Sequence, residues 1–173
     1  MANHTIDNPV GIDKAIQRLQ NDLFNDLGWS KLEVYARIYK TETSGKDIPQ
    51  PYLNNGQYLK DAFINDKSNA HIFFDVDDVQ SNVSGPKFEC KVKIIFMVNL
   101  KNLFPSVIHR ADSECQSQAW ELVYARKEFD IINIETGLKK VFNGYDLSGI
   151  KKLDTQPYHV FAINTKLKYH INN

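Results

Sequence analysis

The chain has 173 residues, and its 21 basic side chains are balanced by 21 acidic ones, so its formal net charge near pH 7 is zero. A chain of this length fits one domain and can bury a hydrophobic core without disulfides. The balanced charge argues against a general polyanion-binding protein, because affinity for phosphates depends on an excess of cationic side chains.

The first predicted element is an amphipathic helix over Ile12–Leu27. Asn8-Pro9 suits the start of a helix, Gly28 suits its end, and apolar residues recur between them at helical spacing. A strand is expected over Leu32–Thr41, where one face of the alternating pattern is mainly apolar. The chain therefore begins with a helix followed by a strand.

A long insertion follows this strand, and we expect its end to form a projecting hairpin. Glu42–Pro51 is polar and contains a glycine and two prolines. Asn55-Gly56 lies between two short apolar-aromatic pieces, and Asn-Gly is typical of a tight hairpin turn because both residues tolerate positive φ. We therefore interpret residues 42–60 as an arm whose hairpin contacts another subunit. The side chains expected at this interface are Tyr52, Leu53, Tyr58 and Leu59.

Three more strands are predicted from period-two alternation. The first is Ala70–Val76, and a polar loop rich in turn residues is expected after it, over Asp77–Pro86. The clearest strand is Phe88–Leu100, whose second face is charged at its start and apolar at its end. The last strand is expected over His159–Ile171.

Two further helices are expected between the long strand and the last one. Ile108–Arg126 contains a helical apolar stripe, which Trp120 and Tyr124 widen beyond one face. These two aromatic residues suit either a core or an interface, and both alternatives stay open. Phe129–Ile134 is interpreted as a short apolar link, and Glu135–Asn143 as the third helix. The predicted fold is a single α+β domain, in which helices pack on one face of a small antiparallel sheet.

One acidic run, Asp75, Asp77 and Asp78, is a candidate for metal chemistry. Carboxylates two positions apart on a strand share a face and could hold Mg²⁺ or Ca²⁺. A two-metal nuclease or phosphoryl-transfer enzyme would need further acids, and no motif identifies them. A solvated turn after the strand is the simpler interpretation, since Asp favours turns.

Other reactive side chains lack recognised motifs. The five histidines show no HxH or HExxH spacing, and Cys90 and Cys115 lie in apolar patterns without metal-ligand spacing. We expect two buried free thiols, no metal, no cofactor and no enzymatic activity. Lys166, Lys168 and His170 share one strand face that could touch a nucleic acid, joined by Lys91 and Lys93 if the two strands are neighbours. A solvated sheet face is the simpler interpretation.

The sequence also suggests where the chain is made. Its first eleven residues are polar, and its longest apolar stretch, Ile94–Val98, is far too short to span a membrane. We therefore expect the protein to be made and assembled in the cytoplasm, without membrane contact.

The order of predicted elements resembles that of the tail-terminator and neck-ring proteins of tailed bacteriophages. The resemblance is carried by Ile134–Tyr145 leading into Tyr158–Tyr169, and by Ile12–Leu27 leading into Leu32–Thr41. The Asn- and Lys-rich composition is also similar to the virion tail ring proteins of crAss-like phages. The resemblance implies a homo-oligomeric ring that connects the portal to the tail and lines the DNA channel. Its partners would be neighbouring ring, portal or tail proteins, with passive proximity to genomic DNA. The helix around Ile108–Arg126 is additional to the smallest terminator pattern.

Overall fold

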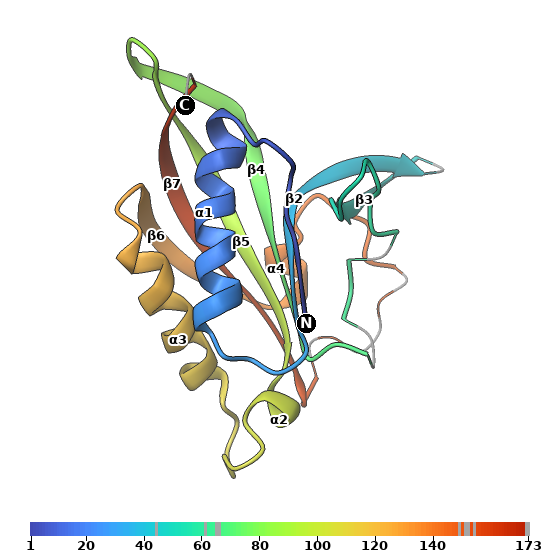
Figure 1. The fold of residues 1–173 in the computed structure, drawn as a ribbon. Coiled ribbons are helices and arrows are strands. Elements are labelled where there is room, and N and C mark those ends of the chain that lie inside the picture. The colour runs from blue at the N-terminus through green and yellow to red at the C-terminus, as the bar shows by residue number, and fades with distance from the viewer. Residues whose placement is uncertain are drawn as a thin grey trace.

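The computed structural model describes residues 1–43, 45–60, 62–64, 67–148, 150, 153 and 155–171. These residues form a mixed α/β fold with one seven-stranded sheet and four helices (Figure 1). None of the described helices combines the length and the apolar character needed to cross a membrane. The elements in chain order are β1 (Ala2–His4), α1 (Gly11–Asp26), β2 (Leu32–Thr43), β3 (Lys46–Pro51), β4 (Ala70–Ser84), β5 (Lys87–Asn99), α2 (Leu100–Leu103), α3 (Asp112–Ala125), β6 (Phe129–Thr136), α4 (Leu138–Val141) and β7 (Tyr158–His170).

The sheet is mixed rather than antiparallel. Its strand order is β1-β2-β4-β5-β7-β6, and β3 pairs with β2 outside this path. The pairs β1–β2 and β2–β4 are parallel, whereas β4, β5, β7 and β6 pair antiparallel. The predicted antiparallel sheet is therefore wrong on the β1–β2–β4 side. The reason lies in the connections, because α1 links β1 to β2 and a long segment links β2 to β4, so each strand starts again at the same end.

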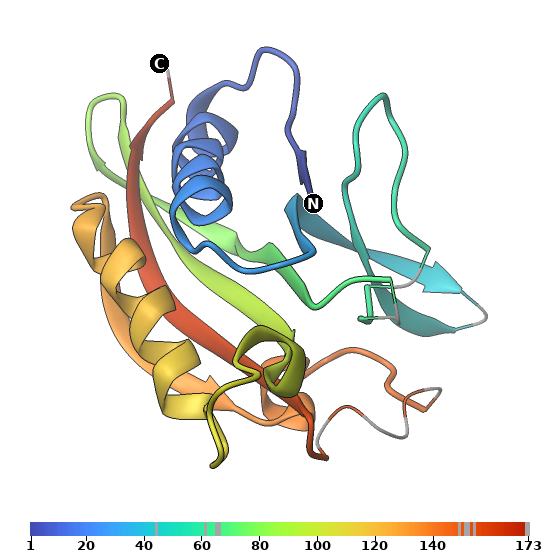
Figure 2. The ribbon, with the colours of Figure 1, turned by 60° about the horizontal axis from the view of Figure 1, so that its bottom comes forward.

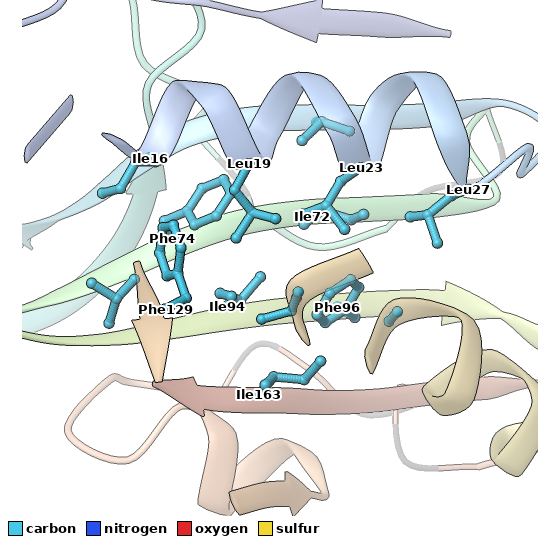
Figure 3. Packing of buried hydrophobic residues seen from close by; sticks show 14 of the residues in the cluster. Ile16, Leu19, Leu23, Leu27, Ile72, Phe74, Ile94, Phe96, Phe129 and Ile163 are labelled. Carbon is cyan, nitrogen blue, oxygen red and sulfur yellow. The ribbon is translucent and has the colours of Figure 1, made fainter. Parts of the chain in front are cut away.

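The first face of the sheet carries the core that the sequence predicts. The apolar stripe of α1, centred on Leu19 and Leu23, points at β4 and β5 (Figure 3). Both leucine side chains and Phe96 of β5 are fully buried. The amphipathic helix expected over Ile12–Leu27 therefore packs its apolar stripe on the sheet. Cys115 and Ala119 of α3 belong to the same cluster, so α3 lies beside α1 on this face.

The second face carries a separate core, so the helices are not confined to one face as expected. Ile95 and Met97 of β5 point to this side and are fully buried. Leu138 and Val141 of α4 cover them, together with Phe142 and other apolar residues of the connecting segments. The expectation that β5 is covered on both faces at its end is confirmed.

Two predictions around the third helix are wrong. Phe129–Ile134 is not a link but most of β6, which pairs with β7 on both sides of a register shift between Ile131 and Asn133. The helix expected over Glu135–Asn143 shrinks to the four residues of α4. Gly137, with a φ of 96°, separates β6 from α4, so the backbone cannot continue smoothly from one to the other.

The projecting arm expected at residues 42–60 is not confirmed. Lys46–Pro51 forms β3 and pairs with β2, and Leu53 and Leu59 pack against the second core of their own chain. The tight turn at Asn55-Gly56 is present, since both residues have positive φ and Tyr52 bridges Tyr58 across it. Ser44 lies outside the described residues. In Figure 1 the paired strands β2 and β3 reach away from the rest of the sheet on one side, and the β4–β5 hairpin extends beyond the other strands at one end of the sheet (Figures 1 and 2).

Candidate functional site

An open hollow of about 740 Å³ lies over the polar part of the second sheet face. It arises because α4 and its neighbours cover only the apolar end of β5. Beyond Ile95, the same face of β5 continues as Lys93 and Lys91, and neighbouring strands contribute polar side chains there as well. The charged side chains that line the hollow are Arg37, Lys40, Asp75, Asp77, Asp78, Lys91, Lys93 and Glu135. Four cations therefore face four carboxylates.

Asp75 is a carboxyl group of this hollow whose pKa is raised. Its side chain is half-buried, and the Tyr145 hydroxyl donates a hydrogen bond of 3.4 Å to its Oδ1. Burial raises the pKa of Asp75 above its usual value, and the ammonium groups of Lys93 and Lys40 oppose this shift. The pKa of Tyr145 is raised as well, first by burial and then by the nearby Asp75 carboxylate. One hydrogen bond therefore joins Tyr145 to Asp75 at the wall of the hollow.

Asp77 and Asp78 do not join Asp75 in one ligand set. Both are exposed, and the β4–β5 register slips between Val76 and Gln80, so the alternation on which the metal hypothesis depends is broken. The Asp77 carboxylate instead accepts a hydrogen bond of 3.1 Å from the backbone N–H of Val79. Among the residues that the structure describes, no group of three or more His, Cys, Asp or Glu side chains is placed to hold a metal ion.

Changing Asp75 to Asn should make the protein more stable at neutral pH. Because the folded state binds the Asp75 proton more tightly than the unfolded chain, wild-type stability falls as the pH rises from the ordinary value of 3.8 through the raised pKa. The Asn variant lacks this loss and can still accept the Tyr145 hydrogen bond. Urea unfolding at about pH 4 and about pH 7 should show a gain that grows with pH. Asp78→Asn, at an exposed position, is the control and should change stability little at either pH; an equal gain there would contradict the prediction.

The two strands that carry the lysines considered for nucleic-acid contact, β5 and β7, are neighbours in the sheet. In the β5–β7 ladder, Lys91 lies directly opposite Lys166, and Glu89 lies opposite Lys168. Most of these charges are neutralised by carboxylates, at Nζ–O distances of 3.1 Å for Lys93–Glu135, 3.3 Å for Lys166–Glu89 and 2.6 Å for Lys168–Asp130. Within the described residues Lys91 forms no ion pair. The face therefore has little excess positive charge with which to hold a phosphate backbone.

The two cysteines are buried, as predicted. Burial raises the pKa of Cys90 to about 11 and raises the pKa of Cys115 further still. A thiolate is the nucleophilic form, so both thiols are poorly suited to catalysis. His109 pairs with Glu114 at 2.6 Å on the exposed surface, whereas Cys115 faces the core. The two residues are thus not arranged as a nucleophile and its base.

The residues predicted at an interface divide into exposed and packed side chains. Tyr58 is exposed and its ring contacts the rings of Tyr39 and Tyr52, each with centroids 5.4 Å apart. Leu53 and Leu59 are half-buried against the second core. On α3, Trp120 is half-buried and Tyr124 is 73% exposed.

The β4–β5 hairpin, hereafter the arm (Asp77–Lys87), is the candidate site that the sequence analysis missed. Every residue of the arm is exposed, including Val79 and Val83. Gly85 and Pro86 form its turn, since Ser84 pairs directly with Lys87 on either side of them. The available signal was a two-residue turn flanked by β-branched and small polar residues, which favours a hairpin over an irregular loop.

Comparison of the sequence with models of known protein families, and with curated proteins, found no match.

Proposed function

We propose that this protein is a structural subunit of a tailed-phage virion, whose copies form a ring in the neck or tail. The ring would connect the portal to the tail and line the DNA channel. The observation that carries this proposal is the arm, a two-stranded ribbon that extends from the sheet with eleven consecutive exposed residues. An isolated two-stranded ribbon is marginally stable in water, and its exposed valines gain from being covered. Contact with another subunit would supply that cover.

The architecture supports the same proposal. In this proposal α1 and α3, which share one hydrophobic cluster with the sheet, correspond to the helices of the tail-terminator arrangement that the sequence resembles. The paired charges on the opposite face suit passive proximity to genomic DNA rather than tight binding to it. In this proposal the subunit acts by assembly and not by catalysis, is made in the cytoplasm of a bacterial host, and contacts neighbouring ring, portal or tail proteins.

The alternative of a metal-dependent nuclease or phosphoryl-transfer enzyme has less support. It requires Asp75, Asp77 and Asp78 to converge, whereas Asp75 bonds to Tyr145 and the other two side chains face solvent.

The proposal is tested by the size of the purified chain. Sedimentation should give a mass that is a fixed multiple of 19.9 kDa, and electron micrographs should show closed rings. Mass spectrometry of purified phage particles should detect the chain in a constant ratio to the portal protein. A chain that stays monomeric at every concentration and is absent from particles would overturn the proposal.

A further inference from the structure

A second hollow, of about 370 Å³, lies at the opposite end of β5 from the arm. It is formed mainly by the segment Leu100–Ala111, which contains α2 and the turns after it. Phe104, Val107 and Ile108 are among the side chains that line it, and Ile108 is fully exposed. Ile108 adds an uncovered apolar side chain to a hollow of mixed polar and apolar lining, and covering that side chain with another surface would be favourable.

The arm and this hollow are separated by the whole length of β5. The arm lies at the start of β5, at Lys87, and α2 follows the end of β5, at Asn99 (Figure 1). The residues that line the hollow begin at Leu100, the first residue of α2. Thirteen strand residues span roughly 40 Å. An arm cannot reach the hollow of its own chain across this distance, but it can reach the hollow of a second copy.

The two surfaces carry opposite charge. The arm contains Asp77, Asp78 and Lys87, which gives it one net negative charge. The segment Leu100–Ala111 around the hollow contains Lys101 and Arg110, and Arg110 pairs with Asp112 at 3.4 Å, so within the described residues Lys101 supplies its unpaired positive charge. Within the described residues, Asp77, Asp78 and Lys101 form no ion pair, so these charges are available to a partner.

We propose that the arm of one copy docks into the hollow beside α2 of the next copy, with its valines against Phe104 and Ile108 and its aspartates near Lys101. This inference rests on the proposed function, because it names the contact between subunits of the ring. The two contact surfaces are different, so the contact is head-to-tail, and such a contact yields a ring when the rotation closes. Each subunit would then have one occupied hollow and one buried arm.

Two substitutions at exposed positions test this contact without disturbing the core. Val79→Lys alters the arm, and Ile108→Asp alters the hollow. Both variants should keep the circular dichroism spectrum and melting temperature of the wild-type subunit, because neither side chain is buried. Each variant alone should sediment as a monomer under conditions in which the wild type forms rings.

An equimolar mixture of the two variants should form a 1:1 heterodimer and nothing larger. The intact arm of the Ile108 variant can dock into the intact hollow of the Val79 variant, whereas the two altered surfaces stop further growth. Native mass spectrometry with one variant isotopically labelled would measure the composition. The inference would be overturned if either variant alone formed rings like those of the wild type, or if the mixture remained monomeric. Either result would leave the ring proposal standing. A wild-type chain that is itself monomeric would instead overturn the proposed function.

Discussion

Replacing Phe96 with aspartate should unfold the protein. Phe96 is fully buried in the apolar half of β5, stacked on Phe161 with ring centroids 4.6 Å apart and edge-on to Trp29 at 6.2 Å. The change removes these contacts, worth about 3–5 kcal/mol for a buried aromatic side chain. It also buries a carboxylate without a partner, which costs several kcal/mol more. Together these losses are comparable with the roughly 5–15 kcal/mol that typically stabilises a domain.

Circular dichroism and one-dimensional NMR would measure this loss of structure. Lys91→Asp is the matched control, because it places the same charge on the same strand at an exposed position. It also removes the like-charge pair that Lys91 makes with Lys166 across the ladder, so its stability should be unchanged or slightly higher. A cooperative melt near the wild-type temperature for Phe96→Asp would show that the core face of β5 is wrongly assigned.

Elements with long, regular apolar patterns could be predicted from the sequence. The helix over Ile12–Leu27 and the long strand over Phe88–Leu100 were predicted to within one or two residues of α1 and β5. Each has one face that must be buried, so its periodicity is strong. The second face of β5 changes from charged to apolar residues along the strand. This change also predicted where other residues begin to bury that face, which is at Ile95.

The segments that were misassigned lie at the edges of the sheet. β6 is an edge strand whose exposed residues, such as Ile132, do not alternate cleanly, so its sequence resembles a link. The outer half of β4 is exposed throughout and contains two register shifts, which removes the alternation that defines a strand. Local patterns could not show that Leu53 and Leu59 of the segment 42–60 pack on the second core whereas the arm stays exposed. That packing depends on residues of the second core that are distant in the sequence.

The candidate sites show the same limit. Lys91 and Lys166 could be placed on polar strand faces from the sequence, but their direct opposition depends on β5 and β7 being neighbours. The hollow beside α2 is formed by a segment without regular pattern, and only the position of Ile108 in space reveals that its side chain is uncovered.

Replacing Phe142 with alanine should destabilise the protein by about 3–5 kcal/mol, the usual cost of deleting a buried aromatic ring. Phe142 is fully buried directly after α4, and its ring contacts Phe63, Phe73 and Tyr145 at centroid distances of 5.6, 5.9 and 6.1 Å. The change leaves a cavity in the second core. Urea unfolding monitored by circular dichroism would measure the free energy of unfolding.

The matched control is Tyr58→Ala, which also removes an aromatic ring with aromatic neighbours. Tyr58 is 41% exposed, so much of its ring stays in water in the folded state and its loss should cost about 1 kcal/mol or less. A large difference between the two variants is expected because the second core, and not the Tyr52–Tyr58 turn, fixes α4 on the sheet. Equal losses would mean that Phe142 is poorly packed and that the apolar cover of Ile95 and Met97 comes from elsewhere.

Because Tyr145 rests on the Phe142 ring and donates a hydrogen bond to Asp75, the alanine variant should also weaken that hydrogen bond. Loosening this wall should reduce the pH-dependent gain of Asp75→Asn in the Phe142→Ala background.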